Sequence, residues 1–123
     1  MPEKILLVDD HTLFAEGLKY LLGTYGIEVA GVAKNGLEAL KKARALKPDI
    51  ILMDIIMPGC SGIEALKLIK AEMPEIKIVM LTTSEEDEDL FQAVKIGASG
   101  YLLKSMNGDE LIDMIKDLQS GGM

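Results

Sequence analysis

Acidic, hydroxyl and amine side chains follow four of the short apolar segments in this chain. Asp9 and Asp10 follow the first apolar segment, and Asp54 ends the third. Thr82 follows the fourth and Lys104 follows the fifth. Because the carboxyl ends of parallel strands lie along one edge of a sheet, these residues are expected to meet there. Three carboxylates at one place would repel one another and raise one another's pKa unless a cation lay among them.

The expected cation is Mg²⁺, which accepts a few carboxylate oxygens, keeps several waters and leaves room for a phosphate oxygen. Lys104 would add a mobile positive charge, and Thr82 would add a hydrogen-bond donor. A metal and a lysine that neutralise phosphoryl oxygens while a carboxylate attacks in line are the parts of a phosphoryl-transfer site. Together the residues predict magnesium-dependent phosphoryl transfer.

Each of these residues, considered alone, also has an ordinary structural interpretation. Asp9 and Asp10 could cap the helix that follows them. Thr82 could simply end a strand, and Lys104 could be a surface lysine. His11 is expected to lie in the first turn of the helix rather than to bind the metal. The functional interpretation rests on the joint occurrence of the other residues at the carboxyl ends of strands.

Apolar patterning predicts five strands that alternate with five helices. The expected strands cover residues 5–8, 27–32, 50–53, 76–81 and 101–103, and the expected helices cover residues 12–24, 35–46, 61–73, 85–96 and 107–118. Unbroken apolar runs such as 50–53 are typical of strands buried on both faces. The alternation predicts an α/β fold, with a parallel sheet covered by helices on both faces. Residues 1–119 are expected to form one domain, and residues 120–123 the start of a linker or a frayed end.

The expected helix ends carry their own signals. Ser61 followed by Glu64 predicts a capping box at the third helix. Asn107 is expected to cap the last helix, and Gly97 to end the fourth. Pro48 is expected to stop the second helix, because the residue before a proline avoids helical geometry.

The composition excludes several classes of protein. The chain has 123 residues, of which 49% are hydrophobic, and one cysteine, Cys60. A single cysteine forms no disulfide within the chain and fits a reducing compartment, so a cytoplasmic location is expected. The net charge of −7 argues against nucleic-acid binding by this domain itself. No apolar segment is long enough to act as a signal peptide or to span a membrane.

The chain resembles a response-regulator receiver domain over essentially its whole length. The motifs that carry the resemblance are Asp9-Asp10, Asp54 followed by Met57-Pro58-Gly59 and Gly62, Thr82, and Lys104. The runs at residues 8–11 and 97–104 are most similar to regulators with LuxR-type helix-turn-helix output domains. The resemblance implies a flavodoxin-like, doubly wound (βα)5 fold, with a five-stranded parallel sheet in the strand order 2-1-3-4-5.

The resemblance also implies a phosphoacceptor site in two-component signalling. Asp54 would take a phosphoryl group from a sensor histidine kinase or a phosphotransfer protein in a phosphorelay. The acyl phosphate would hydrolyse slowly by itself, so the domain is expected to be a phosphoacceptor rather than an enzyme. Asp10, Asp54 and the backbone carbonyl of Ile56 would hold Mg²⁺ directly, and Asp9 would hold it largely through water.

A switch is implied by the same resemblance. Lys104 would pair with phosphoryl oxygens, Thr82 would hydrogen-bond one of them, and Tyr101 would change rotamer as Thr82 moves. The surface of the fourth helix and fifth strand would then repack and control an output domain, with transcription as the expected output. Homodimerisation is expected through the first and last helices or through the fourth-helix surface. Many relatives have proline after the lysine, with a cis bond there, whereas this chain has Ser105.

Other families with similar parts fit less well. A haloacid-dehalogenase-type phosphatase would need a second acid two residues after Asp54, where this chain has Ile56. A flavodoxin-like electron carrier would bind phosphate after the first strand, where Asp9 and Asp10 would repel it. The chain has no glycine-rich loop of the type that binds nucleoside triphosphates. The alternative that stays open is a non-phosphorylated interaction module of the same fold.

Overall fold

The computed structural model describes residues 4–57, 61–83 and 88–119, with Glu88 described by its backbone alone. Three predicted features lie outside these residues: the turn at 58–60 with Cys60, the start of the fourth helix at 85–87, and the end segment 120–123. No helix in the described part of the chain is both long enough and apolar enough to cross a membrane.

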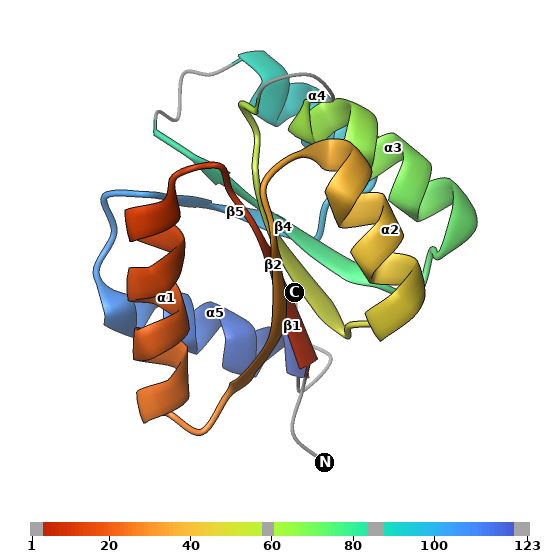
Figure 1. Ribbon diagram of the computed structural model, residues 1–123. Helices are drawn as coiled ribbons and strands as arrows, with labels where there is room; N and C mark the ends of the chain where they lie inside the picture. The colour runs from red at the N-terminus through yellow and green to blue at the C-terminus, as the bar shows by residue number, and fades with distance from the viewer. Residues whose placement is uncertain (1–3, 58–60, 84–87, 120–123) are drawn as a thin grey trace.

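Within the described residues the chain forms five strands that alternate with five helices. They are β1 (Lys4–Val8), α1 (Thr12–Thr24), β2 (Glu28–Ala33), α2 (Gly36–Leu46), β3 (Ile50–Asp54), α3 (Gly62–Glu72), β4 (Lys77–Thr82), α4 (Glu88–Ile96), β5 (Gly100–Leu103) and α5 (Gly108–Gln119). The strands form one parallel sheet in the order β2-β1-β3-β4-β5. Helices α1 and α5 cover one face of the sheet, and α2, α3 and α4 cover the other (Figure 1). The predicted fold and strand order are confirmed.

Strand β3 shows why the predicted strands are apolar without interruption. Every residue of β3 is buried. Ile51 and Met53 point into the core shared with α2, α3 and α4. Ile50 and Leu52 point into the core shared with α1 and α5. A strand packed on both faces has no solvent side, so its sequence carries no polar alternation.

The ends of several elements follow the predicted signals. Ser61 and Glu64 form the predicted capping box at the start of α3. The Asn107 side chain accepts a hydrogen bond from the Glu110 backbone N–H at 3.0 Å, and α5 begins at the next residue. Strand β4 extends one residue further than predicted, to Thr82, because Thr82 pairs with β5 in the ladder. Ladder hydrogen bonds, rather than side-chain polarity, therefore decide where this strand ends.

Gly62 lets the start of α3 pack directly on the backbone that follows β3. A Cβ at this position would lie 2.3 Å from the Asp54 carbonyl oxygen and 2.8 Å from the Ile55 Cα. The Gly62 N–H also donates to the Ile55 carbonyl oxygen at 3.0 Å. Because these contacts are with backbone, they have little freedom to move away. The glycine thereby fixes the chain beside Asp54.

Replacing Gly62 with alanine should destabilise the protein by about 1–3 kcal/mol, the range that overpacking typically costs. The Gly17→Ala variant is the control, because a Cβ at Gly17, within α1, meets nothing within 4 Å. That variant should gain about 0.5–1 kcal/mol, since alanine favours the helical backbone. Urea unfolding measures both changes. A Gly62→Ala protein as stable as the native chain would contradict the close approach of α3 to Asp54.

Candidate functional site

The carboxyl ends of β1, β3, β4 and β5 bring the predicted chemical groups to one place. Asp9 directly follows β1, Asp54 ends β3, Thr82 ends β4 and Lys104 follows β5. The Lys104 ammonium lies 2.8 Å from Asp9 Oδ2 and 3.0 Å from Asp54 Oδ2. Residues separated by up to 95 positions in the chain thus meet as one ion-pair cluster.

Backbone hydrogen bonds hold these residues because the sheet continues one step past its strand ends. The Ile55 N–H donates to the Leu81 carbonyl at 3.0 Å, directly after Asp54. The Lys104 N–H donates to the Thr82 carbonyl at 2.7 Å. The side chains that carry charge are therefore attached to ordered backbone rather than to free loops.

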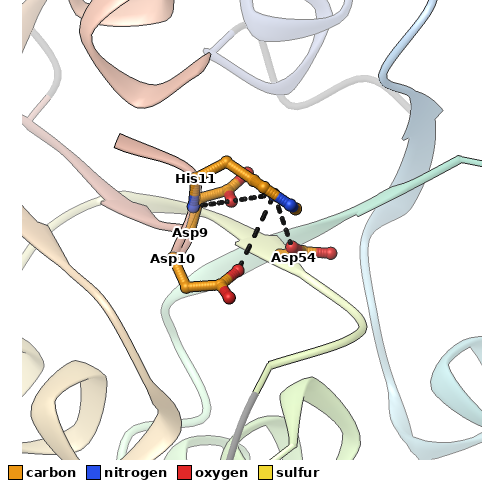
Figure 2. Close-up of side chains that lie close together, drawn as sticks. All are labelled: Asp9, Asp10, His11 and Asp54. Carbon is orange, nitrogen blue, oxygen red and sulfur yellow. Dashed lines mark hydrogen bonds and ion pairs between the residues drawn. The ribbon is translucent and has the colours of Figure 1, made fainter. Parts of the chain in front are cut away.

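His11 lies closer to the acids than the sequence indicated. It occupies the N-cap of α1, one residue before the helix, rather than the first helical turn. Its Nδ1 lies 3.0 Å from Asp9 Oδ1, 3.7 Å from Asp10 Oδ1 and 3.8 Å from Asp54 Oδ2 (Figure 2). The signal for this placement was its position directly after two acids at a strand end.

The cluster carries more negative than positive charge. Asp9 and Asp54 are 2% and 4% exposed, and Asp10 lies beside them with its side chain 34% exposed. Burial raises the pKa of Asp54 above its usual value, the hydrogen bond from Lys104 opposes this, and the charge of Asp9 adds to it. Burial lowers the pKa of Lys104, but the hydrogen bonds with Asp9 and Asp54 outweigh it, so the pKa is raised. The acids thus outnumber the ammonium that stabilises them.

This donor set fits a hard divalent cation. One ligand atom from each of Asp9, Asp10, His11 and Asp54 can be chosen so that all four lie within 4.8 Å of one another. Asp9 Oδ2 is buried, and its partner is the Lys104 ammonium at 2.8 Å. Carboxylate oxygens are the ligands that Mg²⁺ and Ca²⁺ take in proteins. The acidic pocket can therefore hold a metal ion.

A cavity of about 220 Å³ opens beside the ion pair. Its lining includes Asp54, Thr82, Lys104 and Ile56. Ile56 is 64% exposed, and its backbone N–H donates to Asp54 Oδ1 at 3.2 Å. Tyr101 does not line this cavity but lies on β5 with its side chain 38% exposed. The structure thus places Thr82 and Asp54 at one cavity, whereas Tyr101, predicted to act as a switch residue, lies outside it.

Phe14 is a contact of the site that sequence reasoning missed. The Lys104 ammonium lies 4.8 Å from the centroid of the Phe14 ring, a distance that favours a cation–π interaction. Phe14 lies within the helix predicted over residues 12–24, and an apolar side chain in that helix gave no sign of a contact with Lys104. The described residues contain no cis peptide bond, so the Lys104–Ser105 bond is trans.

Asp54→Asn should stabilise the metal-free protein at neutral pH. The raised pKa means that the folded state binds a proton more readily than the unfolded state, so ionised Asp54 opposes folding above its folded pKa. Removing the charge should raise the free energy of unfolding by roughly 0.5–2 kcal/mol, the usual gain from a single stabilising substitution. The difference should shrink as the pH falls toward the unfolded value near 3.8. Urea unfolding in a chelator at several pH values measures this, and a less stable variant at neutral pH would contradict it.

Comparisons with known proteins agree with the motifs. The sequence profile of the response regulator receiver domain matches residues 5–116. The transcriptional regulatory protein LnrK of Bacillus subtilis is 44% identical over 121 residues, which are 98% of this chain and 55% of LnrK. The response regulator protein VraR of Staphylococcus aureus strain NCTC 8325 is 39% identical over 122 residues, or 98% of this chain and 58% of VraR. The chain therefore spans little more than half the length of these curated relatives.

Solved structures show the same likeness. A LuxR-family two-component response regulator from Aurantimonas superposes with a TM-score of 0.92 at 33% identity, covering 99% of this chain and 88% of that one. The signal receiver domain of the putative response regulator NarL from Mycobacterium tuberculosis has a TM-score of 0.91 at 30% identity, covering 98% of each chain. With a family match across 5–116 and the predicted acids, threonine and lysine at one sheet edge, this chain belongs to the response regulator receiver domain family.

Proposed function

We propose that this chain is the phosphoacceptor domain of a two-component response regulator, and that Asp54 receives the phosphoryl group. The observation that carries the proposal is the position of Lys104, whose ammonium hydrogen-bonds Asp54 Oδ2 at 3.0 Å at the wall of a small cavity. A carboxylate with an ammonium beside it can attack phosphorus while that ammonium stabilises the charge on the phosphoryl oxygens.

The donor would be a phosphohistidine of a sensor kinase or of a phosphotransfer protein. An Asp54 carboxylate oxygen attacks the phosphorus, a P–O bond forms, and the P–N bond to the donor imidazole breaks. The imidazole nitrogen leaves with the electron pair of that bond. The product is an acyl phosphate on Asp54, which water hydrolyses slowly without a dedicated active-site base. This is phosphoacceptor chemistry rather than turnover of a substrate.

Mg²⁺ is the cation that this chemistry calls for. Asp10, Asp54 and the Ile56 backbone carbonyl would hold it directly, with Asp9 acting largely through water. When bound, the ion supplies positive charge that neutralises phosphoryl oxygens. Lys104 would then leave Asp9 and keep its contact with the group on Asp54. Exposed Ile56 at the cavity wall would limit the approach of water to the acyl phosphate.

The signal would pass through Thr82 to the surface of α4 and β5. Phosphorylation adds a charge of about −1.5 to −2 and three strong acceptors beside Thr82. Thr82 would turn toward these acceptors, and Tyr101 would take a new rotamer. Phe91, Val94 and Tyr101 are 66%, 55% and 38% exposed, so this surface has apolar side chains available for a partner or a second copy. The response is a shift in population between two packings of the same elements.

The output is proposed from the relatives. LnrK is named a transcriptional regulatory protein, and the Aurantimonas structure belongs to a LuxR-family regulator. This chain corresponds to just over half of LnrK. We therefore expect the domain to work in the cytoplasm and to control a DNA-binding output segment, while its own net charge of −7 keeps it from binding DNA.

Asp54→Asn should abolish labelling by a small acyl phosphate in the presence of Mg²⁺, because an amide oxygen is a poor nucleophile. Intact-mass spectrometry measures the fraction that gains one phosphoryl group. The matched control is Asp113→Asn, which removes an exposed carboxylate in α5 and should be labelled like the native chain. A chelator should also suppress labelling of the native chain.

Two outcomes would contradict the proposal. Equal labelling of the Asp54→Asn and native proteins would move the phosphosite elsewhere. A native chain that stays unmodified with every phosphodonor would favour the non-phosphorylated interaction module instead.

A further inference from the structure

The acid cluster holds an imidazole nitrogen that the proposed magnesium chemistry does not use. His11 Nδ1 lies 3.0 Å from the Lys104 ammonium. The same ammonium lies 2.8 Å from Asp9 Oδ2 and 3.0 Å from Asp54 Oδ2. Two oxygens and one nitrogen therefore converge on a single positive charge. The position of the Lys104 ammonium shows where a positive charge is stabilised by both nitrogen and oxygen atoms.

The position of His11 is fixed by its own backbone. Its backbone N–H donates to Asp9 Oδ1 at 2.8 Å, and its extended N-cap geometry turns the ring back over the acids (Figure 2). With the ring proton on Nε2, Nδ1 presents a lone pair to the cluster. The imidazole is thus held ready for a cation, although its side chain is 63% exposed.

The spacing of the donors matches metal coordination. Nδ1 lies 3.0, 3.7 and 3.8 Å from oxygens of Asp9, Asp10 and Asp54. Ligands about 2.0 Å from a tetrahedral zinc ion are about 3.3 Å apart. The buried Asp9 Oδ2 lies 2.8 Å from the same Lys104 ammonium, the positive charge that a metal ion would have to replace there. The four donor atoms lie within 4.8 Å of one another, so the side chains would close by up to about 1.5 Å around a tetrahedral ion.

We propose that His11 Nδ1 is a metal ligand and that this cluster binds divalent transition-metal ions, with Zn²⁺ as the reference case, through one nitrogen and the neighbouring carboxylates. Mg²⁺ takes oxygen ligands, whereas imidazole suits Zn²⁺, Cu²⁺ and Ni²⁺. His11 therefore gives the cluster a preference for imidazole-accepting ions that the carboxylates alone would not give. The inference rests on the metal-binding part of the proposed function and is independent of which residue is phosphorylated.

The test uses the untagged chain and its His11→Phe variant, which keeps a ring of similar size without nitrogen. Because the chain has one histidine, any imidazole signal must come from His11. Pulsed EPR of the Cu²⁺-loaded native protein should show coupling to imidazole ¹⁴N that His11→Phe abolishes. Dilution of the sample distinguishes coordination within one chain from coordination between chains. Calorimetric titration should show Zn²⁺ affinity at least tenfold lower in the variant and Mg²⁺ affinity changed less than about twofold.

The possible failures can be told apart. Absence of imidazole coupling in the native protein, or Zn²⁺ affinity equal in the two proteins, overturns the role of His11 and leaves the magnesium site intact. Loss of Mg²⁺ affinity in His11→Phe by the same factor as Zn²⁺ affinity also overturns it, because the histidine would then only support the fold of the site. Binding of Zn²⁺ through His11 with no measurable Mg²⁺ binding supports this inference and contradicts the proposed magnesium site.

Discussion

The ion pairs of Lys104 with Asp9 and Asp54 are the interaction on which the site depends. Both carboxylates are almost fully buried, and a buried charge without a partner costs several kcal/mol. One ammonium at 2.8 and 3.0 Å satisfies part of this need, while Asp10 beside them adds further negative charge. The site is thus short of positive charge in its metal-free form. Because the pocket lacks positive charge, it favours binding of a divalent cation. A bound cation would in turn help to hold a negatively charged group.

The parallel sheet holds the acidic residues close together despite their repulsion. Parallel strands buried on both faces give the site residues an ordered backbone, because Ile55 and Lys104 continue the hydrogen-bond ladder after the strands end. Because Gly62 has no Cβ, the start of α3 packs directly against the backbone beside Asp54. Two apolar cores pack the strands on both faces of the sheet, and this apolar burial is the main favourable term that holds the strand ends and their acids together. The fold thus determines where Asp9, Asp54 and Lys104 lie, and their charges determine which ions and groups the site can bind.

The sequence alone predicted the elements and the meeting of the acids with Lys104, since strand β3 and the capping box at Ser61 follow from local patterns. It did not predict the orientation of His11 or the contact of Phe14 with Lys104. These depend on how α1 approaches β5, and residues 93 positions apart leave no local signal of their contact. Strand ends were misplaced by about one residue, as at Thr82, because a ladder partner rather than the side chain sets the limit.

The Mg²⁺ affinity of Lys104→Met, compared with that of the native chain, tests the central claim most directly. Methionine keeps the length and apolar stem of lysine but removes the ammonium that neutralises Asp9 and Asp54. If that ammonium competes with the cation for these carboxylates, the variant should bind Mg²⁺ severalfold or more tightly, on the order of the 1.4 kcal/mol that corresponds to a tenfold change. Equal or weaker Mg²⁺ binding by the variant would show that the acids and the lysine do not form one electrostatic unit.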